Sequence, residues 1–321
     1  MKKTIFITGA SSGIGKATAI HFQQNGWNVI ATMRSPEKES ELTRLENVLI
    51  QKVDVLDVAS IKESINNGIS KFGKIDALLN NAGYGAYGPL ESFPRENILR
   101  QFHTNVIGLI DVTQTMIPHF RKNKSGVIVN ISSIGGQMTF ALGSLYHGTK
   151  FAVEGISESL HYEMAEIGVK VKIVEPGFIA TDFGSRSFDF QAGDVAEYQP
   201  IIGALMKQWQ NPNNTISPAN LVAEVIFNAV TDGTNQLRYR AGDDAHFLLD
   251  TRKKMNDKIK AVFEKSITNY FHNCLALGGS YVVKSKSQEE RLHPHQDWNI
   301  VDEDIYRSFN IWVPLVDLTE S

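Results

Sequence analysis

The sequence contains a single cysteine, Cys274, so no disulfide can form within the chain. Scarcity of cysteine is typical of proteins from a reducing compartment, and we expect a cytoplasmic protein. No apolar run approaches the ~20 residues that cross a bilayer as a helix, so we expect no membrane partner. The apolar run that follows Met-Lys-Lys stops at a glycine turn, which indicates a strand rather than a signal peptide.

An excess of charge of one sign is also lacking. The net charge is −3 and no basic stripe is visible, so no nucleic-acid partner is expected. Internal repeats and low-complexity tracts are absent as well. The 321 residues, 42% of them hydrophobic and 21% charged, are typical of a globular protein with one large domain or two small ones.

Apolar runs alternate with amphipathic segments up to about residue 265, which predicts alternating strands and helices. Several runs, such as Val127 to Ile131, are nearly continuous in apolar residues, as in strands that are covered on both faces. The pattern predicts an α/β fold with a doubly wound parallel sheet of the Rossmann type, and an active site at the carboxyl ends of the strands. Strands are expected at 3–8, 28–33, 48–53, 75–80, 126–131, 169–175 and 236–240, and helices near 13–25, 58–71, 95–120, 146–167, 217–230 and 243–263.

A glycine-rich turn follows the first expected strand, and an amphipathic run that predicts a helix follows the turn. Glycines at such a place let a pyrophosphate approach backbone N–H groups at the start of the helix. A lone glycine cluster can be an ordinary turn, but its position between a strand and a helix predicts a dinucleotide site. The residues expected to contact the cofactor are Thr8, Gly9, Ser11, Ser12, Gly13, Ile14 and Gly15.

The end of the second expected strand, Ala31-Thr32-Met33-Arg34-Ser35, bears on which dinucleotide binds. An acidic residue there would bind the ribose 2′-OH of NAD, whereas an arginine accommodates the 2′-phosphate of NADP. No carboxylate is present, and Arg34 is well placed for a phosphate. We therefore expect NADP, with NAD as the less favoured cofactor. The alternative is that Arg34 is a solvated loop residue.

Ser133, Tyr146 and Lys150 form the pattern Ser…Tyr-x-x-x-Lys. A separation of four residues places Tyr146 and Lys150 on the same face of a helix, where the ammonium is expected to lower the pKa of the phenol. Such a phenol can move a proton to or from a substrate oxygen that the Ser133 hydroxyl holds. The alternatives are a packed aromatic residue, a solvated lysine, and Ser132 in place of Ser133. Together with the dinucleotide site, the pattern predicts interconversion of an alcohol and a ketone or aldehyde by hydride transfer.

These motifs, in this order over about residues 3–265, resemble the short-chain dehydrogenase/reductase family. The resemblance implies that Ser133, Tyr146 and Lys150 are catalytic and that Lys150 also binds the nicotinamide ribose. It implies that Asn105, in His-Thr-Asn-Val-Ile-Gly, positions a water that links Lys150 to solvent. Besides Tyr146 and Lys150, it adds cofactor contacts at Asp54, Asn81, Ala82, Gly83, Pro176, Gly177 and Thr181.

Residues 31–34 and 146–155 resemble the branch that contains 17β-hydroxysteroid and retinol-type dehydrogenases, a likeness that assigns no substrate. The family often forms dimers or tetramers, so the resemblance makes a homo-oligomer an expected kind of assembly. The alternative function is an NADP(H)-binding regulatory module without turnover. The presence of both Tyr146 and Lys150 disfavours that alternative.

Residues 178–215 combine aromatic side chains, among them Phe188 and Trp209, with glycine, serine and proline. This composition predicts a lid over an apolar pocket, to which Tyr87, Phe140 and Leu142 add walls. An equally weighted alternative is that the aromatic residues fix the segment to the domain or form a subunit interface. The expected partner is a small-molecule carbonyl or alcohol, which is apolar under the first interpretation.

A change of composition near residue 268 predicts a catalytic domain over 1–268 and an atypical C-terminal extension over 269–321. The run His293-Pro294-His295-Gln296-Asp297 resembles the front part of a phytanoyl-CoA-dioxygenase-like oxygenase, in which a His-x-Asp pair and a later histidine hold iron. No histidine follows His295. We therefore expect a truncated fragment without oxygenase activity, and no metal site.

Overall fold

The computed structural model describes residues 2–181, 187–211, 215–270, 274–277, 280–283 and 307–308, with side chains described as far as residue 258. The chain divides into two units, Met1–Leu249 and Asp250–Ser321. The first unit holds the predicted parallel sheet and the helices expected before residue 243.

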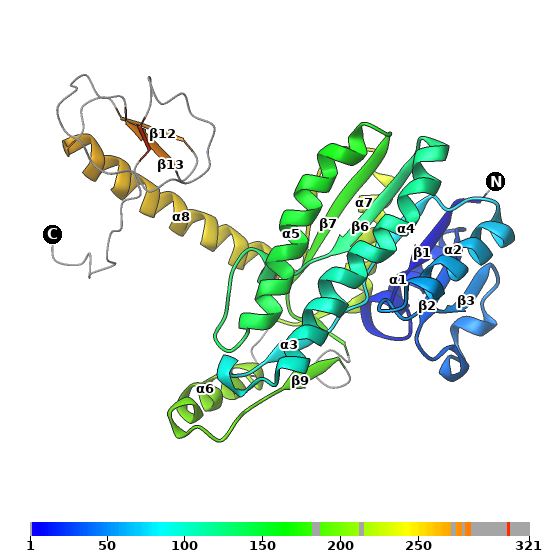
Figure 1. Cartoon of the computed structure of the whole chain (residues 1–321), viewed down its shortest axis with the longest axis horizontal. Coiled ribbons are helices and arrows are strands. Elements are labelled where there is room, and N and C mark those ends of the chain that lie inside the picture. The colour runs from blue at the N-terminus through cyan, green and yellow to red at the C-terminus, as the bar shows by residue number, and fades with distance from the viewer. Residues whose placement is uncertain are drawn as a thin grey trace. The chain divides into compact units, whose positions relative to one another are not determined.

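The first unit is built on a sheet of seven parallel strands in the order β11-β7-β6-β4-β1-β2-β3 (Figure 1). Strand β1 lies at its centre, in register with β2 on one side (Thr4 opposite Asn28) and β4 on the other (Ile5 opposite Ala77). The order reverses direction at β1 and β4, which confirms the predicted doubly wound α/β fold. The strands are β1 Thr4–Ile7, β2 Asn28–Met33, β3 Val48–Lys52, β4 Ala77–Asn80, β6 Gly126–Ile131, β7 Val169–Pro176 and β11 Arg238–Ala241.

Apolar residues on both faces of the central strands explain why helices cover both faces of the sheet. Ile5 and Ile7 of β1 belong to one core, and the intervening Phe6 belongs to the other, because successive side chains point to opposite faces. Helices α1 and α7 contribute Phe22 and Ile226 to the first core, and α2, α4 and α5 line the second. The helices are α1 Gly13–Gln24, α2 Val58–Phe72, α3 Arg95–Phe102, α4 Gly108–Asn123, α5 Ser144–Ala165, α6 Gln199–Trp209, α7 Ala219–Thr231 and α8 Asp243–Tyr270. Short 3₁₀ turns lie at Pro36–Lys38, Leu42–Arg44, Leu90–Ser92, Ile134–Gly136 and Ala196–Tyr198.

Two parts of this unit differ from the sequence-based expectation. The helix expected at 95–120 is interrupted by a π-helical turn, His103–Ile107, which separates α3 from α4. The segment 178–215, which was expected to form a lid, contains α6 and two short strands. Strand β9 (Phe188–Phe190) pairs with β5 (Gly85–Tyr87), and β8 (Ile179–Ala180) pairs with β10 (Ser217–Pro218). Strands of two or three residues give no alternating pattern in a sequence, because the pattern needs several residues to show.

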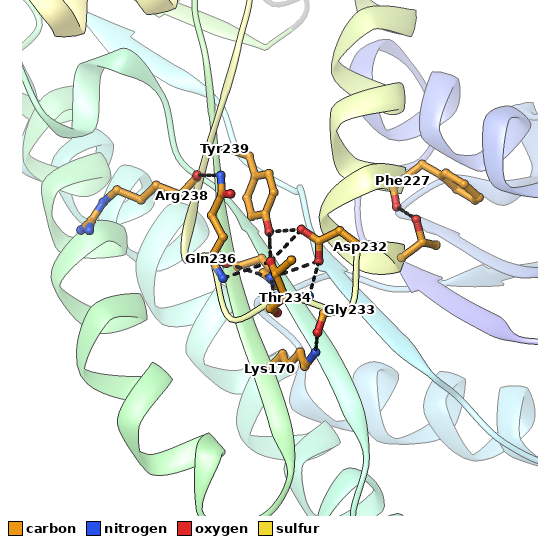
Figure 2. Close-up of polar contacts among 10 residues, drawn as sticks. Lys170, Phe227, Asp232, Gly233, Thr234, Gln236, Arg238 and Tyr239 are labelled. Atoms are coloured by element: carbon orange, nitrogen blue, oxygen red, sulfur yellow. Dashed lines mark hydrogen bonds and ion pairs between the residues drawn. The ribbon is translucent and has the colours of Figure 1, made fainter.

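A polar cluster fixes the loop between α7 and β11 (Figure 2). The Tyr239 hydroxyl donates to Asp232 Oδ2 over 2.5 Å, and the backbone and hydroxyl of Thr234 donate to the same carboxylate. Lys172 is 1% exposed and donates to the carbonyl oxygens of Thr234 and Gln236 and to the Tyr239 hydroxyl. This loop precedes β11, so the cluster lies at the edge of the sheet opposite the carboxyl ends of the strands.

The second unit contains the remainder of α8 and a three-stranded antiparallel sheet in the order β12-β13-β14. These strands are Cys274–Leu277, Ser280–Val283 and Arg307–Ser308. The expected oxygenase-like residues His293, His295 and Asp297 lie outside the described residues. The domain boundary near 268 and the oxygenase resemblance therefore stay predictions. Within the described part of the chain, no helix has the length and apolar character required to cross a membrane.

Candidate active site

The glycine-rich turn lies between β1 and α1 and has the backbone that a dinucleotide cradle needs. Gly9 and Gly13 have φ values of +67° and +55°, a region that side chains disfavour. A Cβ atom at Gly15 would collide with the Gly9 carbonyl, so this position of the turn also requires glycine. Helix α1 begins at Gly13, and its N-cap residue Ser12 makes no side-chain capping bond, which leaves the N–H groups of the first turn without that cap. The residues present therefore fit a pyrophosphate.

Thr8 and Asn81 hold this turn against the end of β4. The Thr8 hydroxyl accepts hydrogen bonds from the backbone N–H groups of Asn81 and Ala82 at 3.0 and 3.1 Å. The Asn81 amide donates to the carbonyl oxygens of Thr8 and Gly9, both at 3.0 Å. Two segments that are 73 residues apart in the sequence are thus joined at the carboxyl ends of adjacent strands. Gly83, two residues further on, lies against the Asn105 side chain.

The residues expected around the adenosine end lie in the neighbouring loops. Arg34 is exposed directly after β2. Asp54 follows β3, is half-buried, and accepts a hydrogen bond from the Leu56 N–H at 3.0 Å. Because β2 and β3 are adjacent, both residues lie at the same edge of the sheet as the glycine turn.

Tyr146, Lys150 and Ser133 meet at the start of α5. Tyr146 and Lys150 are both buried on that helix, with Lys150 Nζ 5.8 Å from the centre of the Tyr146 ring. Ser133 follows β6; its hydroxyl accepts from the Gly135 N–H at 3.0 Å, and its side chain acts to lower the pKa of Tyr146. Lys150 Nζ also donates to the Ile131 carbonyl at 2.8 Å. The neighbouring Ser132 hydroxyl is buried without a hydrogen-bond partner among the described residues.

The protonation of this group differs from the sequence-based expectation. Burial raises the pKa of the Tyr146 phenol to about 12, and the hydrogen bond from Ser133 acts in the opposite direction. Burial lowers the pKa of Lys150 to about 8, opposed by the charge of Glu154. The expected lowering of the Tyr146 pKa by Lys150 is therefore wrong for the chain by itself, because desolvation of the phenolate outweighs other effects.

Asn105 lies in the π-helical turn and is buried close to the same group. Its Oδ1 accepts from the Tyr84 N–H at 3.0 Å, and its amide donates to the Tyr84 carbonyl at 2.8 Å and the Thr149 hydroxyl at 3.1 Å. Turns of this kind often occur at functional sites. The water-positioning role of Asn105 stays a prediction.

The segment from Pro176 to Thr181 continues from β7 toward the glycine turn. A Cβ atom at Gly13 would lie 3.3 Å from Thr181 Cβ, so Thr181 borders the turn. Asp244 of α8 accepts from the Phe178 N–H at 2.6 Å, and its carboxylate occupies the space that a side chain at Gly177 would need. Asp244 was not predicted as a site residue. Its position after Gly242 and Asp243, at the start of an expected helix, is the signal that could have indicated it.

An aromatic cluster adjoins Tyr146 through Tyr87. The Tyr87 ring centre is 5.4 Å from that of Tyr146, 5.6 Å from that of Phe188 and 5.3 Å from that of Trp209. Trp209 also meets Phe188 edge-on at 5.3 Å. Phe183, another aromatic residue of the expected lid, lies outside the described residues.

His147 is a second residue that the sequence did not single out. It is buried, its Nε2 accepts from the Phe140 N–H at 3.0 Å, and its Nδ1 lies 3.0 Å from the Gly135 carbonyl. The ring therefore carries its hydrogen on Nδ1, and burial lowers its pKa. It fixes the loop that contains Phe140 and Leu142, which line a pocket of about 430 Å³.

No group of three or more histidine, cysteine, aspartate or glutamate side chains in the described residues could hold a metal ion.

Comparison with known proteins agrees with these observations. The short chain dehydrogenase family matches residues 3–192. Two uncharacterized oxidoreductases of Schizosaccharomyces pombe are each 48% identical over 70% of this chain and 94% of their own length. A 3-ketodihydrosphingosine reductase of Bacteroides thetaiotaomicron is 40% identical over 60% of this chain and 71% of its own. Retinol dehydrogenase 16 of Rattus norvegicus is 32% identical over 76% and 82%.

Solved structures show the same fold. A short-chain dehydrogenase from Streptomyces avermitilis covers 84% of this chain and 98% of its own with a TM-score of 0.75 and 31% identity. The protein ElxO with NADP bound covers 75% of this chain and 98% of its own with a TM-score of 0.62 and 29% identity. This chain belongs to the short-chain dehydrogenase family of oxidoreductases.

Proposed function

We propose that the protein is an NADP-dependent oxidoreductase that interconverts an alcohol and a ketone or aldehyde, with Tyr146 as the acid and base. The observation that carries this proposal is the buried Tyr146 phenol with Lys150 Nζ 5.8 Å from its ring centre and with Ser133 acting on its pKa. This group lies at the carboxyl ends of the strands, where the glycine turn also lies. Ligands of open α/β sheets bind at that edge.

The nicotinamide, when bound, supplies the hydride donor or acceptor. In reduction, Ser133 holds the substrate oxygen and Tyr146 donates its proton to the alkoxide that forms there. A phenol with a pKa of about 12 is protonated at neutral pH, so Tyr146 begins as a donor. The Lys150 ammonium stabilises the phenolate that is left, because an opposite charge favours the ionised form. In oxidation, Tyr146 accepts the proton of the substrate alcohol. Lys150 is buried, so its charge is only weakly screened.

NADP is proposed rather than NAD because Arg34 follows β2 and no carboxylate stands beside it in Ala31-Thr32-Met33-Arg34-Ser35. The structural neighbour ElxO was solved with NADP bound, which supports the same choice.

An apolar substrate is proposed from Tyr87, whose ring lies beside that of Tyr146, and from Phe188 and Trp209, whose rings pack against Tyr87. Two relatives are named for substrates with long apolar chains, retinol and 3-ketodihydrosphingosine. A wall of aromatic rings binds such molecules by burying their apolar surface.

The substitution Tyr146→Phe tests the proposal. A panel of ketones and aldehydes with NADPH and NADH, followed by absorbance, identifies a substrate first. We expect Tyr146→Phe to lower kcat for that substrate at least about 100-fold, because a positioned acid contributes about that factor or more. Binding of NADPH, followed by fluorescence titration, is expected to stay nearly unchanged.

The matched control is Tyr162→Phe, since Tyr162 is on the same helix and 70% exposed. Retained turnover in Tyr146→Phe contradicts the assignment. NADPH binding by the unmodified protein without turnover of any carbonyl would instead favour a regulatory module.

A further inference from the structure

Near the proposed catalytic group, three buried side-chain oxygen atoms have no hydrogen-bond partner as far as the structure describes the chain. They are Ser132 Oγ, Glu154 Oε1 and Glu175 Oε2. A Cβ atom at Gly136 would lie 2.5 Å from Ser132 Oγ and 2.9 Å from Glu154 Cγ, so Ser132 and Glu154 lie against the same glycine. Buried polar atoms are rarely left unpaired, and each such atom calls for an explanation.

Glu154 and Glu175 form a pair of buried carboxyl groups around a single guanidinium. Arg238 Nε lies 3.0 Å from Glu154 Oε2 and 3.5 Å from Glu175 Oε1. The side chains of Glu154 and Glu175 are 8% and 1% exposed. The other end of Arg238 is 2.9 Å from Glu158, which is 54% exposed. The Arg238 side chain points away from the Asp232 cluster (Figure 2), so its guanidinium can pair with Glu154 and Glu175.

A single guanidinium lies within ion-pair distance of the two buried carboxyl groups. Lys150 and Glu158 face it from α5, and Arg238 and Arg240 face it from β11. Gln137 donates a neutral hydrogen bond to Glu175. Only Arg238 makes an ion pair with either buried carboxylate among the described residues. A second buried negative charge would be costly, and a carboxyl group in that position keeps its proton instead.

We propose that Glu175 keeps a proton in the neutral range, and that the ionised Glu154 is the positioning residue that keeps Lys150 charged. Glu175 is the protonated member because it is the more deeply buried and the more distant from Arg238. The O–H group of protonated Glu175 provides a hydrogen-bond donor close to the unpaired oxygen atoms. Burial and the Glu154 charge both raise the pKa of Glu175, in agreement with this assignment.

Glu154 acts on Lys150 through the helix. The two residues are four positions apart on α5 and therefore lie on one face. Burial lowers the pKa of Lys150 to about 8, and the Glu154 charge opposes that loss. The inference rests on the proposed function, in which the Lys150 ammonium stabilises the Tyr146 phenolate.

Glutamine substitutions with nearly the same shape separate the two carboxyl groups. Glu154→Gln removes the negative charge beside Lys150, so the pH at which the Tyr146–Lys150 pair loses its proton is expected to fall by about one unit. The measurement is kcat/KM for alcohol oxidation against pH, whose acidic limb reports that proton loss. The plateau is expected to fall as well, because less Lys150 ammonium is left to stabilise the Tyr146 phenolate.

Glu175→Gln replaces a carboxyl group that is already neutral up to neutral pH. The acidic limb of the profile is therefore expected at the same pH as in the unmodified protein. Glu158→Gln is the matched control from the same helix, and no shift of the limb is expected. A limb that stays in place in Glu154→Gln, or moves as far in Glu175→Gln, would overturn the proposal. A purely structural role predicts lower activity without a shift of the limb.

Infrared spectroscopy of the protein without substrate or cofactor provides a readout that does not depend on activity. A protonated carboxyl band at neutral pH is expected in the unmodified protein and in Glu158→Gln, and its loss is expected in Glu175→Gln. A band that no glutamine variant removes would also overturn the proposal. Because this readout is independent of turnover, it stays informative if Tyr146→Phe contradicts the proposed function.

Discussion

At the scale of the residue, burial decides the chemistry of Tyr146 as much as its neighbours do. The spacing to Lys150 predicts a lowered pKa for the phenol, yet the buried ring has a raised one. Desolvation disfavours the phenolate, and the hydrogen bond to Ser133 recovers only part of that cost. Tyr146 is thus protonated at neutral pH, as the proposed role of proton donor in reduction requires.

Arg34 is the residue through which the cofactor preference is tested. If Arg34 binds the 2′-phosphate, Arg34→Leu lowers kcat/KM with NADPH by about 10- to 100-fold, because hydrogen bonds to charged groups contribute about 1.5–3 kcal/mol. The value with NADH is expected to change little. Steady-state kinetics with both cofactors measures the ratio.

The matched control for this substitution is Arg44→Leu, since Arg44 is also exposed. An equal loss with both cofactors, or a clear preference of the unmodified protein for NADH, contradicts the role of Arg34.

At the scale of the element, strand β9 and helix α6 bring aromatic residues of the expected lid against Tyr87. Pairing of β9 with β5 places Phe188 opposite Gly85 and Phe190 opposite Tyr87, and Trp209 ends α6 beside the same rings. Tyr87 and Trp209 are 122 positions apart in the sequence, and only the folded chain brings them together.

Trp209→Leu tests whether this aromatic cluster binds substrate. We expect kcat/KM for a large apolar ketone to fall about 3- to 10-fold, since ring contacts are worth about 0.5–1.5 kcal/mol beyond the area they bury. For a small aliphatic ketone the expected change is less than twofold. Kinetics with a matched pair of ketones measures the difference.

Tyr162→Leu, on the exposed face of α5, serves as the control for loss of an aromatic ring. Equal effects of Trp209→Leu on both ketones would assign the cluster to fixing the segment in place, which is the other interpretation of these rings.

At the scale of the whole molecule, every proposed site residue lies in the unit Met1–Leu249. We therefore expect deletion of residues 275–321 to leave kcat/KM within about twofold of the full chain, because no residue of the proposed site is removed. The comparison is made on proteins whose folding is checked by circular dichroism. Loss of activity in a folded, shortened chain would show that the C-terminal region contributes to the site.

The sequence alone determined the parts of this protein that depend on local pattern. Apolar runs of strand length, glycines between β1 and α1, and four positions between Tyr146 and Lys150 are local features, and they predict the sheet, the cofactor turn and the site residues. The interruption at His103–Ile107 was not predicted, because the apolar spacing on either side of it is that of a helix.

Only the tertiary structure decided which distant residues share the site and what charge they carry there. Asp244 against Gly177, Tyr87 against Trp209, and Arg238 between Glu154 and Glu175 join elements that no short pattern connects. The pKa values of Tyr146 and Lys150 likewise follow from burial, and burial is set by how the whole chain packs. Spacing along a helix fixes which side chains are neighbours, whereas the surrounding packing fixes how water is excluded from them and which protons they keep.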